Sequence, residues 1–556
     1  MKRLVKLLFS LCLLFTLSFG LIVNASENDF EELDVVKEST LVTDQELDCG
    51  VKLYQVNTTA YNDGIIDETR LNDYVVSWFD YGNNPNVRIV NWTSSFIEDW
   101  GGGQATVLAK KYEQTHPGYL VIGAVNGDFF HINENDEVNN LSMQEGEMIK
   151  PYVWDALGIG VLGWTYDGKM ISGIPTVSEN MYLEVLDNDA NKLSETPIAS
   201  VNNAISEEGI TILSKDIEKN GEIKYDFTGM TVVELSYTLH RFSLDGNENN
   251  DRLFVKGVVS NVSKELGQNT VIPQGSVYLV AKDDSLDHIK LGDNLRCQYH
   301  LTGEWEDVYN TTGYYAKILD NGTSLFFESS KDDYTNVVGD PFYINCKKNR
   351  TIVGLREDGS TIFMTVEYRK DGNYGASYYE CAEYLRSVGC TDGWVLDGGG
   401  STSMALRQPS GDFKLIAGGS DGHERSNGNA MLLVVKDPGI TPYMSNVSRF
   451  AATIDLMDNE SPFRKDVFDI KIEVNNEIHD YDGTPITFNN LTEDTKYTAT
   501  IHYKMNLENG EVFSGKVYRT FETYAFAAPS IMFSVLQKSN TELVLDHTVF
   551  KKDGVE

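Results

Sequence analysis

The chain has 556 residues, 41% of them apolar and 11% aromatic, with 46 Lys and Arg against 83 Asp and Glu and a formal net charge of −37. This length predicts two to four domains, and the apolar content excludes a chain that is disordered throughout. The excess of negative charge argues against a nucleic-acid binder or a binder of anionic membranes, because a polyanion would be repelled over most of the surface. It leaves room for one small anionic substrate in a locally basic pocket.

The first 25 residues are typical of a secretory signal peptide. Lys2, Arg3 and Lys6 precede an uncharged apolar run over residues 7–23, and Ala25 offers a small residue at the cleavage point. An uncleaved membrane anchor is the alternative, although the run is slightly short for a span. We therefore expect an exported protein, secreted or held at the cell surface, without a transmembrane segment after cleavage. Residues 26–50 then form an acidic leader or a first edge strand.

The main domain is predicted to span residues 51–436. Alternating and aromatic residues predict a strand over residues 71–79, and apolar residues at helical spacing from Ala105 predict a helix that ends at His116. The continuous apolar run over residues 119–125 predicts a strand buried on both faces. Residues about 175–270 carry no motif, and we interpret them as an elaboration of this domain.

Residues 350–435 have the most regular pattern. A strand is predicted over residues 361–368, and Ser377 with Glu380 forms a capping box that begins a helix. Gly389 stands where a left-handed cap would end that helix, and a short buried strand follows over residues 394–396. This mixture predicts an α+β fold with a mixed sheet, followed by a small all-β sandwich.

The pattern becomes all-β beyond about residue 437. Residues 491–501 have the spacing of a tyrosine corner followed by an alternating strand. Residues 440–525 therefore resemble a fibronectin type III module. Residues 526–556 are predicted to be a tail or the start of a further module.

Five cysteines remain after the signal peptide, an odd number whose spacing fits no zinc site. Export permits a disulfide, and Cys381 with Cys390 is the nearest pair. Free buried thiols are an equally good interpretation.

Two glycine turns, each directly after a buried strand, are the candidates for chemistry. Asp397 is followed by Gly398, Gly399 and Gly400 and then by Ser401 and Thr402. Three glycines are costly for folding unless the backbone must turn sharply or approach a ligand. Asn126-Gly127-Asp128 is the second turn, so two carboxylates are expected to converge at one edge. The alternative is two ordinary turns, each capped by its Asp. Neither is a P-loop or a dinucleotide-binding fingerprint.

Four segments stand out in order along the chain. They are Val125-Asn126-Gly127-Asp128-Phe129-Phe130, Arg350-Thr351-Ile352-Val353-Gly354, Leu396-Asp397-Gly398-Gly399-Gly400-Ser401-Thr402 and Arg425-Ser426-Asn427. Together they resemble the signatures of the phosphodiester glycosidase family. The departure from its pattern is Thr312-Gly313-Tyr314-Tyr315, where the family often has a glycine-rich strand, so one pocket wall is expected to differ in shape.

The resemblance implies hydrolysis of the bond between a sugar's anomeric carbon and a phosphodiester. Asp397 and Asp128 would be the catalytic carboxylates, and Arg350 and Arg425 would neutralise the phosphate. Further substrate contacts would come from the glycine amides, which could form an anion nest, and from four polar residues. These further residues are Gly398, Gly399, Gly400, Asn126, Ser401, Thr402 and Asn427.

Two other functions stay open at this point. One is a non-catalytic surface protein that binds glycans, and the other is a phosphodiesterase that uses the paired Asp residues to hold Ca²⁺ or Mg²⁺. No cofactor is otherwise indicated. The expected partner is a phosphodiester-linked carbohydrate, for example in a cell-wall or capsular polymer, and no oligomeric state is predicted.

Overall fold

The structure is a computed structural model. It describes residues 33–61, 69, 71–94, 100–132, 136–150, 159–175, 181–189, 191–201, 204–214, 217–218, 221–222, 224–237, 253–272, 276–298, 301, 303–326, 347–368, 375–526, 530–539 and 542–550. The predicted signal peptide lies outside these residues. No helix among them is both long and apolar enough to cross a membrane.

The predicted α+β class is wrong, because the protein is nearly all β. Strands account for 54% and helices for 8% of the structure. The two α-helices of the described ranges are α2 (Ala105–Thr115) and α5 (Tyr378–Ser387), and both were expected from the sequence. The error came from their caps and periodicity, which report local structure and do not reveal how many strands surround each helix.

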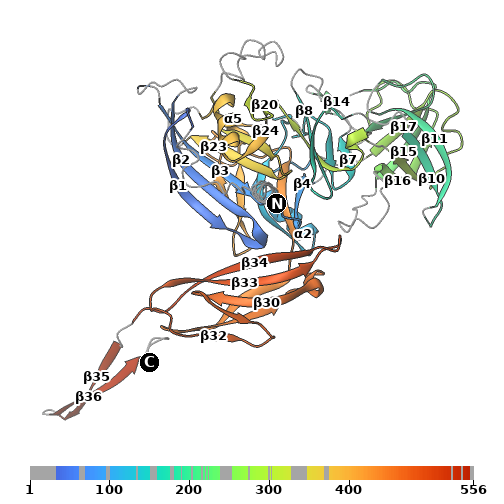
Figure 1. The fold of residues 1–556 in the computed structure, drawn as a ribbon. Helices are drawn as coiled ribbons and strands as arrows, with labels where there is room; N and C mark the ends of the chain where they lie inside the picture. Colours follow the sequence, from blue (N-terminus) through green and yellow to red (C-terminus); the bar gives the residue numbers. More distant parts are fainter. Residues whose placement is uncertain are drawn as a thin grey trace, which may run out of the picture.

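The largest sheet of the central domain has eight strands, and every neighbouring pair in it is antiparallel. The predicted mixed sheet is therefore wrong as well. The edge strand of the eight-stranded sheet is β1 (Figure 1). Of the two alternatives for residues 26–50, an acidic leader or a first edge strand, β1 agrees with the edge strand. In spatial order the strands are β1 (Val36–Glu46), β2 (Lys52–Tyr61), β3 (Leu71–Asp80), β23 (Thr361–Tyr368), β22 (Arg350–Arg356), β24 (Cys390–Val395), β20 (Ala316–Asp320) and β21 (Thr323–Ser324).

A second, five-stranded antiparallel sheet packs against the first. Its central strand β5 is buried along almost its whole length, as its continuous apolar sequence predicts. At Gly123 the two sheets approach so closely that an added Cβ would lie 2.3 Å from the ring of Phe79. In spatial order the strands are β26 (Phe413–Ala417), β25 (Met404–Arg407), β5 (Tyr119–Asn126), β27 (Ala430–Lys436) and β4 (Val87–Trp92).

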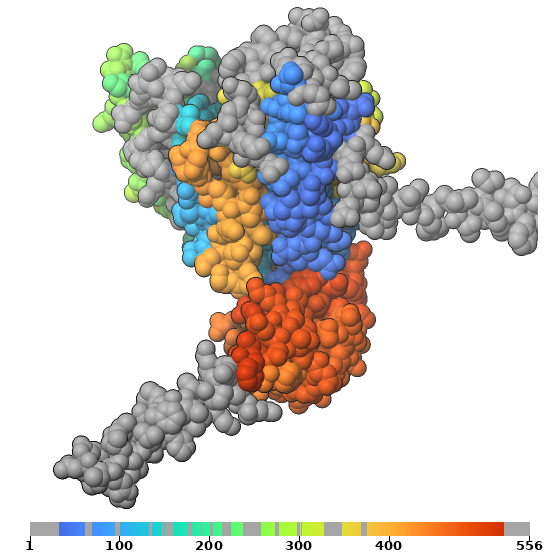
Figure 2. Space-filling view, turned by 90° about the vertical axis from the view of Figure 1, so that its left-hand side faces the viewer, coloured from blue at the N-terminus to red at the C-terminus, as the bar shows by residue number. Residues whose placement is uncertain are grey.

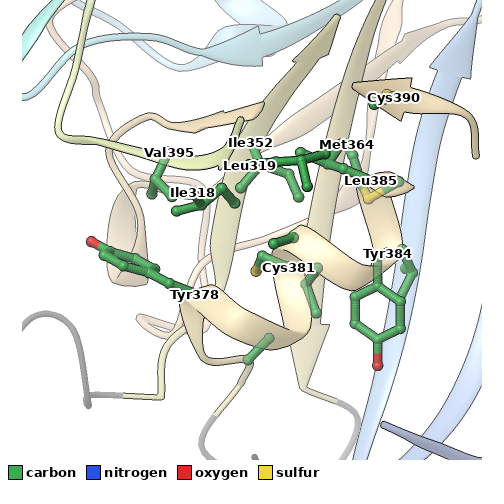
Figure 3. Packing of buried hydrophobic residues seen from close by; sticks show 14 of the residues in the cluster. Ile318, Leu319, Ile352, Met364, Tyr378, Cys381, Tyr384, Leu385, Cys390 and Val395 are labelled. Atoms are coloured by element: carbon green, nitrogen blue, oxygen red, sulfur yellow. The ribbon is translucent and has the colours of Figure 1, made fainter. Parts of the chain in front are cut away.

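One apolar core fills the space between these sheets, and each helix covers an outer face. Phe79, Val125 and Trp394 belong to the shared core. The apolar side of α2 packs on the outer face of the five-stranded sheet. Helix α5 packs its apolar side onto the eight-stranded sheet, where its labelled side chains meet those of the strands (Figure 3). The capping box of Ser377 and Glu380 begins α5, and Gly389 has a φ of 86° just beyond its end.

A closed seven-stranded barrel lies beside the central domain (Figure 1). The stretch of residues about 175–270 that we interpreted as an elaboration supplies five of its strands, and the other two lie beyond residue 270. A three-stranded sheet of β8 (Gly160–Thr165), β9 (Met170–Gly173) and β19 (Val308–Tyr314) and a hairpin of β6 (Ser142–Gln144) and β7 (Glu147–Lys150) adjoin the barrel. A short hairpin, β13 (Ile217–Glu218) with β14 (Gly221–Glu222), lies within the same stretch. The barrel strands are β10 (Met181–Leu186), β11 (Lys192–Val201), β12 (Ile210–Ser214), β17 (Ser276–Ala281), β15 (Thr231–Tyr237), β16 (Leu253–Ser263) and β18 (Asn294–Gln298).

The C-terminal region is a two-sheet antiparallel sandwich that forms a separate lobe below the central domain (Figure 2). The Tyr497 hydroxyl accepts a 2.8 Å hydrogen bond from the Thr492 N–H, as in a tyrosine corner, although membership of the fibronectin type III family stays a prediction. A hairpin follows the sandwich. The strands are β28 (Ile440–Val447), β29 (Ala452–Asp458) and β32 (Ile486–Phe488) in one sheet, β31 (Glu477–Asp480), β30 (Val467–Val474), β33 (Lys496–Asn506) and β34 (Val512–Glu522) in the other, and β35 (Ser530–Ser539) with β36 (Glu542–Phe550) in the hairpin.

The sandwich contacts the central domain through the loop before β2. The Tyr503 hydroxyl lies 3.4 Å from the Cys49 sulfur, and the Tyr518 N–H donates to Asp48. Cys381 and Cys390 are buried free thiols like Cys49, so the disulfide between them does not form.

Candidate active site

The two Asp-bearing turns meet at one end of the facing sheets. Asp128 follows β5 of the five-stranded sheet, and Asp397 follows β24 of the eight-stranded sheet. The Asp397 N–H donates to the Gly127 carbonyl at 3.2 Å, and the Asn126 side-chain amide donates to the Asp397 carbonyl at 2.7 Å. The convergence expected from the sequence is therefore present, between turns 271 residues apart.

Asn126 holds the two turns together and faces away from solvent. Its side-chain oxygen accepts hydrogen bonds from the Thr351 hydroxyl at 2.6 Å and from the Ser403 N–H at 3.0 Å, and the residue is fully buried. Its donors and acceptors are thus used within the protein. The predicted role in substrate binding gives way to a structural one, since Asn126 joins β5, β22 and the glycine turn.

Asp128 lies deep in the site, with 2% of its surface exposed. Its carboxylate accepts two hydrogen bonds from Asn140, one from the backbone N–H at 2.8 Å and one from the side-chain amide at 3.0 Å. Burial raises the pKa of Asp128 to about 6, and the bonds from Asn140 and the charge of Lys150 oppose that rise.

Asp397 is partly exposed as a residue, unlike Asp128, although its carboxyl group is itself buried. Burial of its carboxyl group raises its pKa to about 7, the negative charge of Asp128 adds to the rise, and hydrogen bonds from Ser401 and the Gly398 N–H, with Arg425, oppose it. The charge of Asp128 therefore destabilises the charged form of Asp397, and both pKa values lie well above the ordinary value of an Asp.

Two arginines were predicted to bind phosphate, and Arg425 is the one whose charge acts on Asp397. Its Nη1 donates to the Ser401 hydroxyl at 3.1 Å, while Nε and Nη2 bind one oxygen of Asp421 at 2.8 and 2.6 Å. The side chain is 27% exposed. Asp421 holds the guanidinium in place, and its partly exposed edge can receive an anion.

Arg350 lies in a different environment from the one the sequence indicated. It is 4% exposed, its Nε donates to the Ala376 carbonyl at 3.1 Å, and its guanidinium lies 4.5 Å from the centre of the Tyr378 ring. Its side chain also packs beneath Gly398. These contacts support the glycine turn from below. Of the two arginines, Arg425 is therefore the one that solvent can reach.

The glycine turn is tightly built, and two of its amides are already in use. The Gly398 N–H donates to the Asp397 carboxylate at 2.8 Å, and the Gly399 N–H donates to the Asn349 carbonyl at 2.8 Å. Gly399 has a φ of 63°, and a Cβ on Gly400 would lie 2.0 Å from Arg425. The sharp turn and the close approach of Arg425 explain why these positions are glycines. Because the Gly398 and Gly399 N–H groups already bind protein oxygens, they are not free to bind an anion as the expected nest would require.

Thr402 and Asn427 flank the turn and are buried, at 1% and 2% exposure. Asn427 pairs through its backbone with Gly103, and its side-chain amide donates to the Arg425 carbonyl at 3.2 Å. Both residues therefore lie beside the reactive groups without facing solvent. Within the described ranges, no group of three or more His, Cys, Asp or Glu side chains could hold a metal ion.

The residues that surround Asp128 could not be recognised from the sequence. Asn140 comes twelve residues later, and Asn429, whose side-chain oxygen accepts the Asp128 N–H at 2.8 Å, comes 301 residues later. Asp421 was missed for the same reason. Isolated Asn and Asp residues in polar loops are too common to be recognised as partners without the fold.

The decisive comparison concerns the segment that carries Asp397. Residues 249–434 match the phosphodiester glycosidase family. The matched residues include the turn after β24, Arg350 and Arg425, and they end before the C-terminal sandwich. Asp128 lies outside the matched residues and reaches the site through the fold.

Other comparisons find more distant similarity. The SPbeta prophage-derived uncharacterized protein YomE of Bacillus subtilis (strain 168) is 35% identical over 83 residues, which cover 15% of this chain and only 12% of that protein. A hypothetical protein from Synechocystis has a TM-score of 0.41 at 16% identity, covering 69% of this chain and 62% of that one. The catalytic domain of zebrafish N-acetylglucosamine-1-phosphodiester alpha-N-acetylglucosaminidase, auto-inhibited by its pro-peptide, has a TM-score of 0.35 at 11% identity, covering 72% and 88% of the two chains.

Proposed function

We propose that this protein hydrolyses the bond between the anomeric carbon of a sugar and a phosphate oxygen of a glycosyl-1-phosphodiester. The observation that carries the proposal is the pair of Asp128 and Asp397, which converges inside the glycosidase-like site and titrates near neutral pH. Two carboxylates with perturbed pKa values, one of which acts electrostatically on the other, are typical of acid–base chemistry.

Asp397 is the catalytic residue in this proposal, because it is the member of the pair that is partly exposed. A carboxylate with a pKa of about 7 is a better base than an ordinary Asp and is still largely ionised in mildly alkaline solution. It accepts a proton from water as the water oxygen bonds to the anomeric carbon. Asp128 stays behind it, and its negative charge keeps Asp397 basic.

Arg425 serves the other half of the substrate. Its exposed edge neutralises the phosphodiester, and Asp421 and Ser401 hold the guanidinium in position. As the carbon–oxygen bond breaks, the electron pair leaves with the phosphate oxygen as a phosphate monoester. This is a much better leaving group than an alkoxide, so the reaction does not need a strong general acid.

Export and a polymeric substrate belong to the same proposal. The apolar run after three cations supports secretion, and phosphodiester-linked sugars of cell-wall or capsular polymers are substrates that a secreted hydrolase would meet. The C-terminal sandwich would then help to keep the enzyme near such a surface.

The test is hydrolysis of a panel of sugar-1-phosphodiesters in oxygen-18 water by the chain without residues 1–25. We expect the label in the released sugar, with Asp397→Asn as the inactive control. Label in the phosphate would overturn the proposal and indicate phosphorus–oxygen cleavage, and loss of that activity on chelation would identify a Ca²⁺- or Mg²⁺-dependent phosphodiesterase. Glycan binding with no turnover of any panel member would instead favour a surface binding protein.

A further inference from the structure

Asn140 is the residue in closest contact with the buried carboxylate. It is 1% exposed, and its two N–H groups bind different oxygens of Asp128, Oδ2 at 2.8 Å and Oδ1 at 3.0 Å. A carboxylate held by two donors at separate oxygens cannot rotate without losing one of them. Asn140 therefore fixes both the position and the plane of the Asp128 carboxylate.

The strand segment that departs from the family pattern closes the other side of Asp128. A Cβ on Gly313 would lie 2.3 Å from the Asp128 Oδ1 atom and 2.3 Å from the Asn140 amide nitrogen. No side chain larger than hydrogen fits there without moving the carboxylate. Next to it, the Thr312 hydroxyl lies 3.4 Å from the side-chain amide of Asn429, which in turn binds the Asp128 N–H through its oxygen.

We propose that Asn140 is a positioning residue that holds Asp128 in its charged form against Asp397, with Gly313 providing the space for this contact. The inference rests on the proposed function, because it assigns the group that keeps Asp397 basic. Nothing in the family resemblance assigned a role to Asn140 or Gly313.

Charge and hydrogen bonding around the pair support this assignment. Hydrogen bonds to an ionised carboxylate favour the charged form and are about twice as strong as neutral ones. Lys150 favours a charged Asp128, Arg425 favours a charged Asp397, and the charge of Asp128 disfavours a charged Asp397. Lys150 forms an ion pair with Glu137 at 2.5 Å, and a hydrogen bond from the Phe129 N–H also favours the Asp128 anion. Asn140 contributes two hydrogen bonds to this carboxylate, and these two bonds have the largest stabilising effect on its charged form.

The experiment compares Asn140→Ala with Asn139→Ala over a range of pH. Asn139 is the adjacent residue of the same type, and its side-chain oxygen accepts no hydrogen bond within the described part of the chain. The active form in this proposal has both carboxylates ionised, because Asp397 is a strong enough base only beside a charged Asp128. In Asn140→Ala the acid limb of the kcat/KM profile should therefore move to higher pH by about one unit, so activity should be about ten-fold lower at pH 6 and nearly normal at pH 9. Asn139→Ala should leave the limb in place.

The result that overturns the proposal is an unmoved acid limb in a folded Asn140→Ala protein, or a loss of activity that is equal at every pH. The second pattern would show a merely structural residue. Gly313→Ala gives an independent check, because the crowded carboxylate should move and kcat should fall at least ten-fold with little change in KM. A folded Gly313→Ala protein with normal kcat would contradict the described contact.

A titration that needs no substrate separates this inference from the proposed function. The carboxyl carbon of Asp128 can be followed by NMR in protein labelled at Asp, with Asp128→Asn to assign its signal. Its pKa should rise by about one unit in Asn140→Ala and stay unchanged in Asn139→Ala. If the wild type turns over no sugar phosphodiester, the proposed function fails, and this titration still decides whether Asn140 holds the charge on Asp128.

Discussion

The central domain and the C-terminal sandwich are both built from two packed β-sheets, but they differ in what they bury. Beyond residue 440, Thr523 is the one polar residue that is buried within the described sandwich. The central domain buries Asn126, Asp128, Asn140 and Arg350 at the ends of its strands. Burying polar groups costs free energy unless each is hydrogen-bonded. Under the proposed function, the strand ends of the central domain are thus the place where folding free energy is lost in order to position the reactive groups.

Carboxylates in the two regions also titrate in opposite directions. Asp455 of the sandwich accepts hydrogen bonds from the hydroxyls of Tyr481 and Tyr443, which lower its pKa, whereas burial raises the pKa values of Asp128 and Asp397. A hydrogen-bonded carboxylate at the surface stabilises the fold in its charged form. The charged forms of Asp128 and Asp397 instead destabilise the fold, which is the expected property of carboxylates in a reactive site.

The largest effect should come from removing the carboxylate of Asp397. Asp397→Asn is expected to lower kcat by about 1,000-fold, because general base catalysis contributes on the order of 100- to 10,000-fold. Asp455→Asn, the matched change in the sandwich, should leave kcat unchanged. Steady-state kinetics on the preferred sugar phosphodiester measures both, and equal losses in the two variants would remove the distinction between the regions.

A smaller effect is expected from the arginine at the site. Arg425→Gln should reduce kcat/KM by about 10- to 100-fold, since hydrogen bonds to charged groups contribute roughly 1.5–3 kcal/mol. Both KM and kcat should change, because the phosphate is bound in the ground state and in the transition state. Arg449→Gln removes a comparable ion pair with Glu493 in the sandwich and serves as the control. A normal KM in Arg425→Gln would show that another group binds the phosphate.

The pH dependence of stability should also distinguish the regions. The pKa values of Asp128 and Asp397 are higher in the folded protein than in the unfolded chain, so the folded state binds more protons and stability falls as pH rises from about 4 through 7. In Asp397→Asn this fall should be smaller, and the melting temperature at pH 8 should rise. Thermal denaturation from pH 5 to pH 8 measures it, and parallel curves for the two proteins would contradict the assignment.

The smallest effect on turnover should follow removal of the sandwich. A chain ending at Asp437 retains all residues assigned to the site, so kcat on a soluble substrate should stay within about three-fold. Its melting temperature should fall, because the surface around Cys49, where Tyr503 now packs, becomes exposed. A folded but inactive shortened protein would show that the sandwich contributes to the site itself.

The two helices show what could be predicted locally. The capping box of Ser377 and Glu380 and the turn at Gly389 lie within a dozen residues of one another, and the structure confirms them. The fold class was nevertheless wrong, because the antiparallel pairing of β5 with β25 and β27 joins segments about 280 to 320 positions apart. No local pattern distinguishes such a strand from one in a mixed sheet.

The sequence by itself determined the helices, the strand between Tyr119 and Asn126, and the two glycine turns that carry Asp128 and Asp397. Interactions between residues three or four positions apart, and the backbone freedom of glycine, suffice for these features. Only the tertiary structure decided that Arg350 is buried while Arg425 reaches solvent, and that Asn140 rather than a cation holds the Asp128 carboxylate. Desolvation and hydrogen-bond partners depend on what the whole fold packs around a group, and that information is not contained in its neighbours along the chain.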